Sequence, residues 1–451
     1  MTRLLPTFAL AATLAVLTIG AAPAEARIGL AQAHGFTPHQ VVVKFDGEPT
    51  ARKLRLPDGV GVRERVAALR KNPAVEYAEP NYVATASVAG SSSFVIPDDP
   101  GTLEGPAEAA ASPGGWAFKQ WNFLDFETMT GARLPTSPGG IDAIDAWRHL
   151  EEVGRPGAEG ITVAVLDTGI AYRSQGSAFL RSPDFSAGQF VKGYDFVDRD
   201  KVPLDENGHG THIAGTIAEK TDNGIALAGL AYRAKLMPVR VLDKQGRGNA
   251  TTIAKGIRFA VAHRARVINM SFNFGCGKKV PIVDEALREA YARGVVAVAS
   301  AGTIGSETCV SEPATGPRVI AVGGSTEGGC LGDYSLAGTA IDLLAPGGGS
   351  PAPGCLSVSA RPIYQVTLKP GSTNEFAIPG DYVGTSMAAA HVSGVAAMVL
   401  ASGVLGPQPT PQARVSAVTR RLRTTARSLG LTSTQQGAGL LDAAAATEPA
   451  L

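Results

Sequence analysis

Six short apolar runs between residues 161 and 345 constrain the fold more than any other feature of this sequence. Patterns with helical spacing, such as TTIAKGIRFAVAH and PIVDEALREAYARG, separate several of these runs. Continuous apolar runs joined by helices predict an α/β fold with a mostly parallel sheet that is covered on both faces. Ligands and catalytic groups are then expected beyond the carboxyl ends of the strands. The runs are ITVAVL (161–166), LMPVRV (236–241), RVINMS (266–271), VVAVAS (295–300), RVIAVG (318–323) and AIDLLA (340–345).

The N-terminus predicts export. Arg3 precedes an apolar run that ends near Ala22, and Ala24–Ala26 fits a small-x-small cleavage site. This pattern predicts a signal peptide over residues 1–26 and a secreted, extracellular or periplasmic protein. The alternative is an uncleaved membrane anchor, which Pro6 and the small-residue end disfavour. Because no later segment is long and apolar enough to span a bilayer, no stable association with a membrane is expected.

The rest of the chain divides into three parts. Residues 27–84 read as a small separate unit, with a β-rich run at Gln40–Phe45 and a helix followed by a strand within Val62–Tyr82. Residues 85–115 are rich in Ala, Ser, Gly and Pro, which predicts an exposed linker. Residues 116–451 are predicted to form the main domain.

Charge and cysteine content restrict the partners and the compartment. The formal net charge is +1 and there is no basic block, so nucleic acid and anionic membranes are not expected partners. Four cysteines in an exported chain predict two disulfides, for which three pairings are possible. We favour Cys276–Cys309 and Cys330–Cys355. A metal cage is disfavoured because no two cysteines are close in sequence.

Three stretches place polar groups where structure alone does not require them. Asp167 directly follows a buried strand in AVLDTGI, His209 opens a small-residue helix in NGHGTHIAGTIA, and Ser386 opens another in GTSMAAAHVSGVAAMVL. Each residue also has a purely structural interpretation. Asp167 could cap a turn or helix, His209 could belong to core packing or, weakly, to a metal site, and Ser386 could be an N-cap. Together, an Asp, a His and a Ser at strand ends and helix starts of one sheet suit acyl transfer.

The same stretches resemble the three signature motifs of the subtilisin-like serine proteases, the subtilases, in the same chain order. The likeness extends from about Trp121 to Gly437–Ala446. It implies a three-layer α/β/α fold, no organic cofactor, and a monomeric endopeptidase that hydrolyses peptide bonds of polypeptide substrates. Carried over by position, Ser386 is the nucleophile, His209 the base and Asp167 the orienting carboxylate. His212 and His391 match motif positions outside this triad, so structural roles are expected for them.

The early unit, with VVVKF and NPAVEYAEPNY, resembles the inhibitory propeptide of the family, which also assists folding. This resemblance implies that the protein matures by removal of its own propeptide, and that the propeptide is an inhibitory partner.

The resemblance also implies where substrate binds. VLDKQGRGNAT (241–251) matches an edge strand that pairs with extended peptide, and MSFNFG (270–275) and ASAG (299–302) match the walls of the first specificity pocket. The family usually has Leu-Gly-Gly where this chain has Phe272-Asn273-Phe274, so the usual preference for large apolar side chains is not expected. The expected substrate-binding residues are Gly246, Gly248, Ser271, Phe272, Asn273, Ala301 and Gly302.

Structural calcium is expected by the same resemblance. Asp184 and Asn223 match a carboxylate and an amide of the family's tight calcium site. Asp195, Asp198 and Asp200 are spaced like a second site in thermitase, and hard oxygen ligands on one loop suit calcium. The alternative interpretation of the second group is a solvated acidic loop.

One position departs from the family. The usual second oxyanion donor is an Asn, and this chain has Thr303 in SAGTIG. We expect an active but slow protease in which the hydroxyl of Thr303 partly replaces the amide. The alternative is a catalytically weakened subtilase-fold binding protein. A lipase or esterase is disfavoured because no G-x-S-x-G elbow surrounds Ser386.

Overall fold

The computed structural model describes residues 36–57, 60–82, 96–103, 114–126, 134–303 and 309–449. The predicted signal peptide and much of the predicted linker lie outside these residues. The chain divides into two compact units, Met1–Gly90 and Ser91–Leu451.

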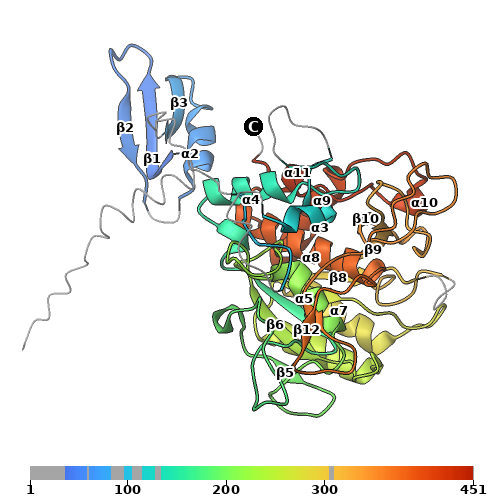
Figure 1. The fold of residues 1–451 in the computed structure, drawn as a ribbon. Coiled ribbons are helices and arrows are strands. Elements are labelled where there is room, and N and C mark those ends of the chain that lie inside the picture. The colour runs from blue at the N-terminus through green and yellow to red at the C-terminus, as the bar shows by residue number, and fades with distance from the viewer. Residues whose placement is uncertain are drawn as a thin grey trace, which may run out of the picture. The chain divides into compact units, whose positions relative to one another are not determined.

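The first unit is a three-stranded antiparallel sheet with one helix (Figure 1). Its strands are β1 (Phe36–Phe45), β2 (Arg52–Arg55) and β3 (Val75–Tyr82), in the order β2-β1-β3, and its helix is α2 (Val62–Leu69). Alternate residues of β1 point inward and pack against the apolar side of α2. The predicted strand and the predicted helix-strand pair are confirmed.

A seven-stranded parallel sheet forms the centre of the second unit, in the order β10-β9-β8-β7-β4-β6-β5. All six apolar runs form strands of this sheet, which confirms the predicted α/β class. The two-residue edge strand β5 is an addition, because two residues carry no periodic signal. The strands are β4 (Thr162–Asp167), β5 (Tyr194–Asp195), β6 (Lys235–Arg240), β7 (Val267–Met270), β8 (Val296–Ser300), β9 (Val319–Ser325) and β10 (Leu343–Pro346).

Apolar side chains cover both faces of the sheet. Along β4, Val163 and Val165 belong to one core cluster, whereas Ala164 and Leu166 belong to the other. Successive side chains of a strand point to opposite faces, so the two clusters are the two packed layers of an α/β/α arrangement. The first layer draws on α4 (Ala143–Glu152), α5 (His209–Ala218), α8 (Thr385–Ser402), α9 (Pro411–Thr424) and α11 (Ala443–Thr447), and the second on α6 (Ala250–Ala262) and α7 (Pro281–Ala292).

Shorter elements complete the second unit. They are α3 (Trp116–Lys119), η1 (Trp121–Phe123), η2 (Pro156–Ala158), η3 (Ala187–Gln189), α10 (Ser433–Gln436) and a two-stranded hairpin of β11 (Thr367–Leu368) and β12 (Phe376–Ala377).

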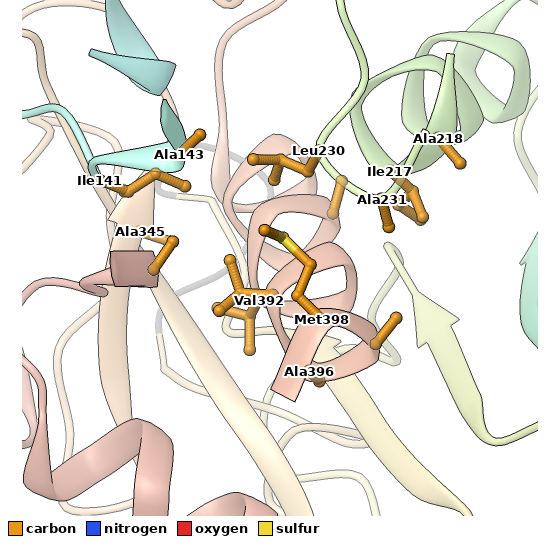
Figure 2. Packing of buried hydrophobic residues seen from close by; sticks show 14 of the residues in the cluster. Ile141, Ala143, Ile217, Ala218, Leu230, Ala231, Ala345, Val392, Ala396 and Met398 are labelled. Atoms are coloured by element: carbon orange, nitrogen blue, oxygen red, sulfur yellow. The ribbon is translucent and has the colours of Figure 1, made fainter. Parts of the chain in front are cut away.

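Helix α8 is buried along most of its length, and its small residues explain how. Ile141 and Ala345 lie on one side of it, and Ile217 and Ala231 lie on the other (Figure 2). A Cβ atom at Gly394 would lie 3.0 Å from Cβ of Leu230, so this face has no room for a larger side chain. Among the described helices, α8 is the one that is long and apolar enough to cross a membrane, but 78% of it is buried within the protein. It is a core helix.

Part of the predicted exposed linker is packed against the second unit instead. The carboxylate of Asp99 is fully buried and accepts hydrogen bonds from the backbone N–H groups of Asp222 (2.8 Å) and Asn223 (3.0 Å). The indole of Trp116 donates to the carbonyl oxygen of Pro97 at 2.7 Å. The prediction of an exposed segment is therefore wrong for residues 96–103. Composition missed this packing because the contacts are made by a few separate residues, the hydrogen-bonded Asp99 and the apolar Ile96 and Leu103, without a periodic pattern.

Both predicted disulfides are present. Cys276 is bonded to Cys309 and Cys330 to Cys355, with Cα–Cα distances of 5.5 Å and 6.1 Å. The Cys276–Cys309 bridge encloses β8 and α7, so it ties the end of β7 to the segment that precedes β9.

Candidate active site

Three polar residues lie beyond the carboxyl ends of the parallel strands. Asp167 is the last residue of β4, His209 is the first residue of α5, and Ser386 is the second residue of α8. The sheet therefore holds the carboxylate directly, while two buried helices present the imidazole and the hydroxyl.

The imidazole of His209 is fixed by a buried carboxylate. Nδ1 of His209 lies 2.8 Å from Oδ1 of Asp167, whose side chain is fully buried. The same oxygen accepts a hydrogen bond from the backbone N–H of Thr168 at 2.8 Å. Burial lowers the pKa of His209, but the charge and hydrogen bond of Asp167 outweigh burial, so the pKa is raised above its usual value. Asp167 thus orients the ring and favours its protonated form.

A second carboxylate, which the sequence interpretation missed, organises the start of α5. Asp205 is buried and accepts from the backbone N–H groups of Asn207 (2.9 Å), Gly208 (3.0 Å) and Thr211 (2.9 Å). It also accepts from the hydroxyl of Thr168 at 2.8 Å, next to Asp167. A carboxylate at a helix N-terminus satisfies otherwise unpaired N–H groups. Its position four residues before His209 was the signal available in the sequence.

Gly210, the second residue of α5, lies too close to the segment that follows β4 to carry a side chain. A Cβ atom there would lie 2.1 Å from the carbonyl oxygen of Gly169. The glycine therefore allows the helix to approach the end of β4, and this approach brings His209 to Asp167.

Ser386 is held near the wall that includes Ser271. The hydroxyl of Ser386 donates to the carbonyl oxygen of Ser271 at 3.1 Å, and the hydroxyl of Ser271 donates to the carbonyl oxygen of Ser386 at 2.9 Å. His209, Ser386 and Thr303 line one pocket of about 340 Å³. The structure therefore brings the predicted nucleophile, base and oxyanion residue to one cavity.

Thr303 lies next to the backbone that leads into α8. A Cβ atom added to Gly384 would be 3.5 Å from the hydroxyl oxygen of Thr303. The backbone of Thr303 pairs with that of Ser335, which fixes the position from which the side chain extends. The neighbouring N–H of Gly302 donates to the hydroxyl of Thr385 at 3.2 Å.

The expected walls of the first specificity pocket contact each other through Asn273. Its amide donates to the carbonyl oxygen of Ser300 at 2.7 Å, and the hydroxyl of Ser300 lies 3.4 Å from the amide oxygen. Phe272 is half-buried and Ala301 is fully buried. The family usually has Gly at this position, so the side chain of Asn273 adds a contact between the two expected walls.

The expected edge strand at 241–251 is not paired as a strand with any described residue. Residues Asp243 to Arg247 form a turn, in which the carboxylate of Asp243 accepts from the N–H groups of Gln245 (2.9 Å) and Arg247 (3.0 Å). Gly246 has a φ of +72°, and a Cβ atom at Gly248 would lie 2.5 Å from the carbonyl oxygen of Val241. Pairing of this segment with an extended peptide stays a prediction.

The residues of the first predicted calcium site lie together. The amide nitrogen of Asn223 is 2.8 Å from Oδ1 of Asp184, and the N–H of Leu227 donates to Oδ2 at 3.1 Å. Burial raises the pKa of Asp184 to about 8, despite these hydrogen bonds, and that of Asp99 to about 6; the charge of Asp99 also raises the pKa of Asp184. A cation would relieve this cost, and rotation of the amide would present its oxygen. Asp184 and Asn223 thus offer oxygen donors that suit calcium, and calcium at this site stays a prediction.

Two residues of the second predicted calcium site, Asp195 and Asp198, form ion pairs with Arg240. The guanidinium of Arg240 lies 2.9 Å from Asp195, 2.7 Å from Asp198 and 2.5 Å from Glu206. The carboxylate of Asp200 instead accepts from the N–H of Val202 at 2.7 Å. These residues therefore fit calcium poorly, although calcium there stays a prediction. The sequence pattern did not predict that Arg240 pairs with these aspartates, because the residues around it form an apolar run typical of a buried strand.

The other two motif histidines have structural partners. The ring of His212 hydrogen-bonds to the carbonyl oxygen of Ile363 at 3.0 Å, and that of His391 to the amide of Asn122 at 2.8 Å. Burial lowers the pKa of His212 to about 3 and that of His391 to about 4, so both rings are neutral at pH 7.

Comparison with known proteins agrees with this arrangement. A sequence model of the subtilase family matches residues 158–439. A thermophilic serine proteinase of Bacillus sp. (strain AK1) is 34% identical over 338 residues, which cover 75% of this chain and 66% of that protein. Thermitase of Thermoactinomyces vulgaris is 34% identical over 266 residues, which cover 59% of this chain and 82% of thermitase. A solved protease of Pseudoalteromonas arctica PAMC 21717 is 29% identical with a TM-score of 0.58, covering 78% of this chain and 98% of that structure.

Proposed function

Because the chain belongs to the subtilase family, we propose that it is a secreted serine endopeptidase that cleaves polypeptides through Asp167, His209 and Ser386. The observation that carries the proposal is the 2.8 Å contact between His209 and Asp167, beside a pocket that His209 shares with Ser386. A buried carboxylate, an imidazole and a hydroxyl in this order suit acyl transfer to serine.

In the proposed reaction, the hydroxyl oxygen of Ser386 attacks the carbonyl carbon of the peptide bond while Nε2 of His209 takes its proton. The imidazolium then gives this proton to the leaving amine, and water repeats the cycle to release the acyl group. Asp167 keeps its negative charge, accepts from the Nδ1–H group and stabilises the imidazolium. The hydroxyl of Ser386 donates to the carbonyl oxygen of Ser271 in the structure, so the proposed reaction requires it to turn toward His209.

The negative oxygen that develops on the substrate requires fixed donors. The backbone N–H of Ser386 is near the N-terminus of α8, where the helix dipole favours negative charge. The hydroxyl of Thr303 lines the same pocket and is the proposed second donor. A hydroxyl on a β-branched side chain is shorter than an amide, so we expect slower turnover than with the usual Asn.

Calcium is proposed as a structural ion held by Asp184, Asn223 and Asp99. When bound, it would neutralise carboxylates that repel each other, and no step of the reaction depends on it. The support is the buried, mutually unfavourable charge of Asp184 and Asp99. The ion would stabilise the loop that follows α5 and, through it, the position of the helix that begins with His209.

Maturation by self-cleavage is proposed for the N-terminal unit, which would inhibit the enzyme before removal. The proposal draws on the family resemblance and on the packing of β1, β2 and β3 with α2 in the described part of this unit. A Ser386→Ala chain should keep this unit attached, whereas the wild-type chain should lose it during expression. Gel electrophoresis with N-terminal sequencing reads the result. A mutant that is still shortened would mean that another protease cuts the chain or that Ser386 is not the nucleophile.

A fluorophosphonate probe combined with a casein assay tests the activity, with Ser386→Ala as the control. We expect covalent labelling and hydrolysis by the wild type and neither by the variant. Labelling with almost no turnover would favour the second candidate, a weakened subtilase-fold binding protein, for which Thr303 is the motivating residue. Absence of both labelling and hydrolysis in a folded, matured sample would contradict the proposed function.

A further inference from the structure

The pocket beside the proposed triad contains a charge that the reaction does not use. Beyond His209 and Ser386, its lining includes the apolar side chains of Leu368 and Pro370 and one carboxylate, that of Asp381. No Lys or Arg lines this pocket among the residues that the structure describes. A substrate group that enters it therefore meets an apolar surface and a single negative charge.

Under the proposed function, this pocket is assigned to the leaving-group side of the scissile bond. The two walls expected to bind the acyl side, Ser271–Asn273 and Ala301–Gly302, do not line it. Ser386 lies between the two regions, because its hydroxyl contacts Ser271 while its own residue and Met387 line the pocket. A peptide whose carbonyl carbon is at Ser386 must pass both regions, so the residue that follows the scissile bond enters the pocket.

The carboxylate of Asp381 is not neutralised by the protein. It is exposed and forms no ion pair with any residue in the described part of the chain. A cation close to the pocket is Lys369, between the lining residues Leu368 and Pro370. Its ammonium group pairs with Glu375 at 3.0 Å across the β11–β12 hairpin, so this positive charge already has a partner.

We propose that Asp381 makes the leaving-group side selective for Lys or Arg in the residue directly after the cleaved bond. The alkyl part of a long cationic side chain would lie along Leu368 and Pro370, and its charged end would reach Asp381. This inference rests on the proposed protease function and adds a substrate class to it. The expected gain is that of an exposed ion pair, about two- to fivefold in kcat/KM for Lys over Ala.

Digestion of a mixed peptide library by the matured enzyme tests this inference, because the library offers many different residues on the acyl side of the cleaved bond. Mass spectrometry identifies the residue after each cut, and pairs of peptides that differ only there, Lys against Ala, give the ratio of kcat/KM. Active sites are counted with the fluorophosphonate probe, so poorly folded variants do not distort the ratio. The variants are Asp381→Asn and Asp381→Lys, and the control is Glu152→Gln, which removes an exposed carboxylate at the end of α4 outside the pocket lining.

We expect the wild type and Glu152→Gln to favour Lys, Asp381→Asn to bring the ratio near one, and Asp381→Lys to favour Asp or Glu. The Lys preference should weaken in 1 M NaCl, because salt screens an exposed pair. Cleavage with no Lys preference, or with one that survives Asp381→Asn, would overturn the assignment of Asp381 and leave the proposed function intact. A wild type that neither binds the probe nor cuts any peptide would defeat both.

Discussion

At the scale of single residues, Thr303 is the side chain at which the proposed oxyanion site departs from the usual pattern of the family. It replaces an amide donor, and it lines the pocket of His209 and Ser386. Loss of one oxyanion donor lowers kcat by about a hundred- to a thousandfold in proteases of this kind. If the hydroxyl partly fills this role, Thr303→Val should lower kcat by about tenfold or more, and Thr303→Asn should raise it. KM should change less than kcat in both variants.

The matched pair Val and Asn separates loss of the hydroxyl from a change of shape, because Val keeps the β-branch of Thr. Steady-state kinetics with one peptide substrate is sufficient. If Thr303→Val leaves kcat unchanged, another group supplies the donor and the assignment of Thr303 is wrong.

His209 gives a second prediction at this scale, for the pH dependence of activity. A base must be neutral, and its pKa is raised because Asp167 outweighs the effect of burial. We therefore expect the acidic limb of kcat/KM to lie above the ordinary imidazole pKa of about 6.5. Asp167→Asn should move this limb to lower pH and reduce kcat by about 10⁴-fold. A wild-type limb below pH 6 would contradict the arrangement.

The same raised pKa has a consequence for stability. The stabilisation from the His209–Asp167 pair is fully present below the unfolded-state pKa of about 6.5 and is lost as pH rises through the folded-state pKa. Urea denaturation of Ser386→Ala at several pH values, with and without Asp167→Asn, measures this contribution without self-digestion.

At the scale of elements, Arg240 joins the end of β6 to the loop that follows β5. Its side chain is 5% exposed, and its guanidinium contacts three carboxylates, Asp195, Asp198 and Glu206. Removing one partner of a buried ion network costs about 3–5 kcal/mol. Arg240→Met should therefore reduce the free energy of unfolding by about this amount, measured by urea denaturation of the Ser386→Ala protein.

The control for Arg240 is Arg258→Met, because Arg258 pairs with Glu289 on the surface at 2.9 Å. An exposed pair contributes about 0–1 kcal/mol, so this variant should change little. Equal losses in both variants would show that burial of Arg240 does not decide its contribution.

Elements also show what could be predicted from the sequence. Strands β4 and β6 to β10 are continuous apolar runs, and burial on both faces makes such runs recognisable. The short strands β5, β11 and β12 have two residues each, which is too few for any periodicity. The proposed triad residues could be singled out from the sequence because their three motifs are local. Asp205 caps the helix that follows it, so a local pattern was available for it. Asp99 and Arg240 act through contacts between separate segments, and no local pattern records such contacts.

At the scale of the whole molecule, the proposed calcium ion would link folding to solution conditions. A ligand that binds only the folded state adds RT ln(1 + [L]/Kd), about 2.7 kcal/mol at a hundredfold excess over Kd. We therefore expect EGTA to lower the melting temperature of the Ser386→Ala protein and calcium to restore it. For a domain of this size, each 1 kcal/mol should correspond to about 2 °C.

Two variants decide which carboxylates hold the ion. Asp184→Asn should abolish the calcium-dependent shift, because Asp184 is buried beside Asn223 and Asp99. Asp198→Asn should retain it, because Arg240 already contacts Asp198. If the shift survives Asp184→Asn and disappears in Asp198→Asn, the ion is held on the loop after β5, and the first site is wrong. Identical melting curves of the parent protein in EGTA and calcium would remove calcium from both sites.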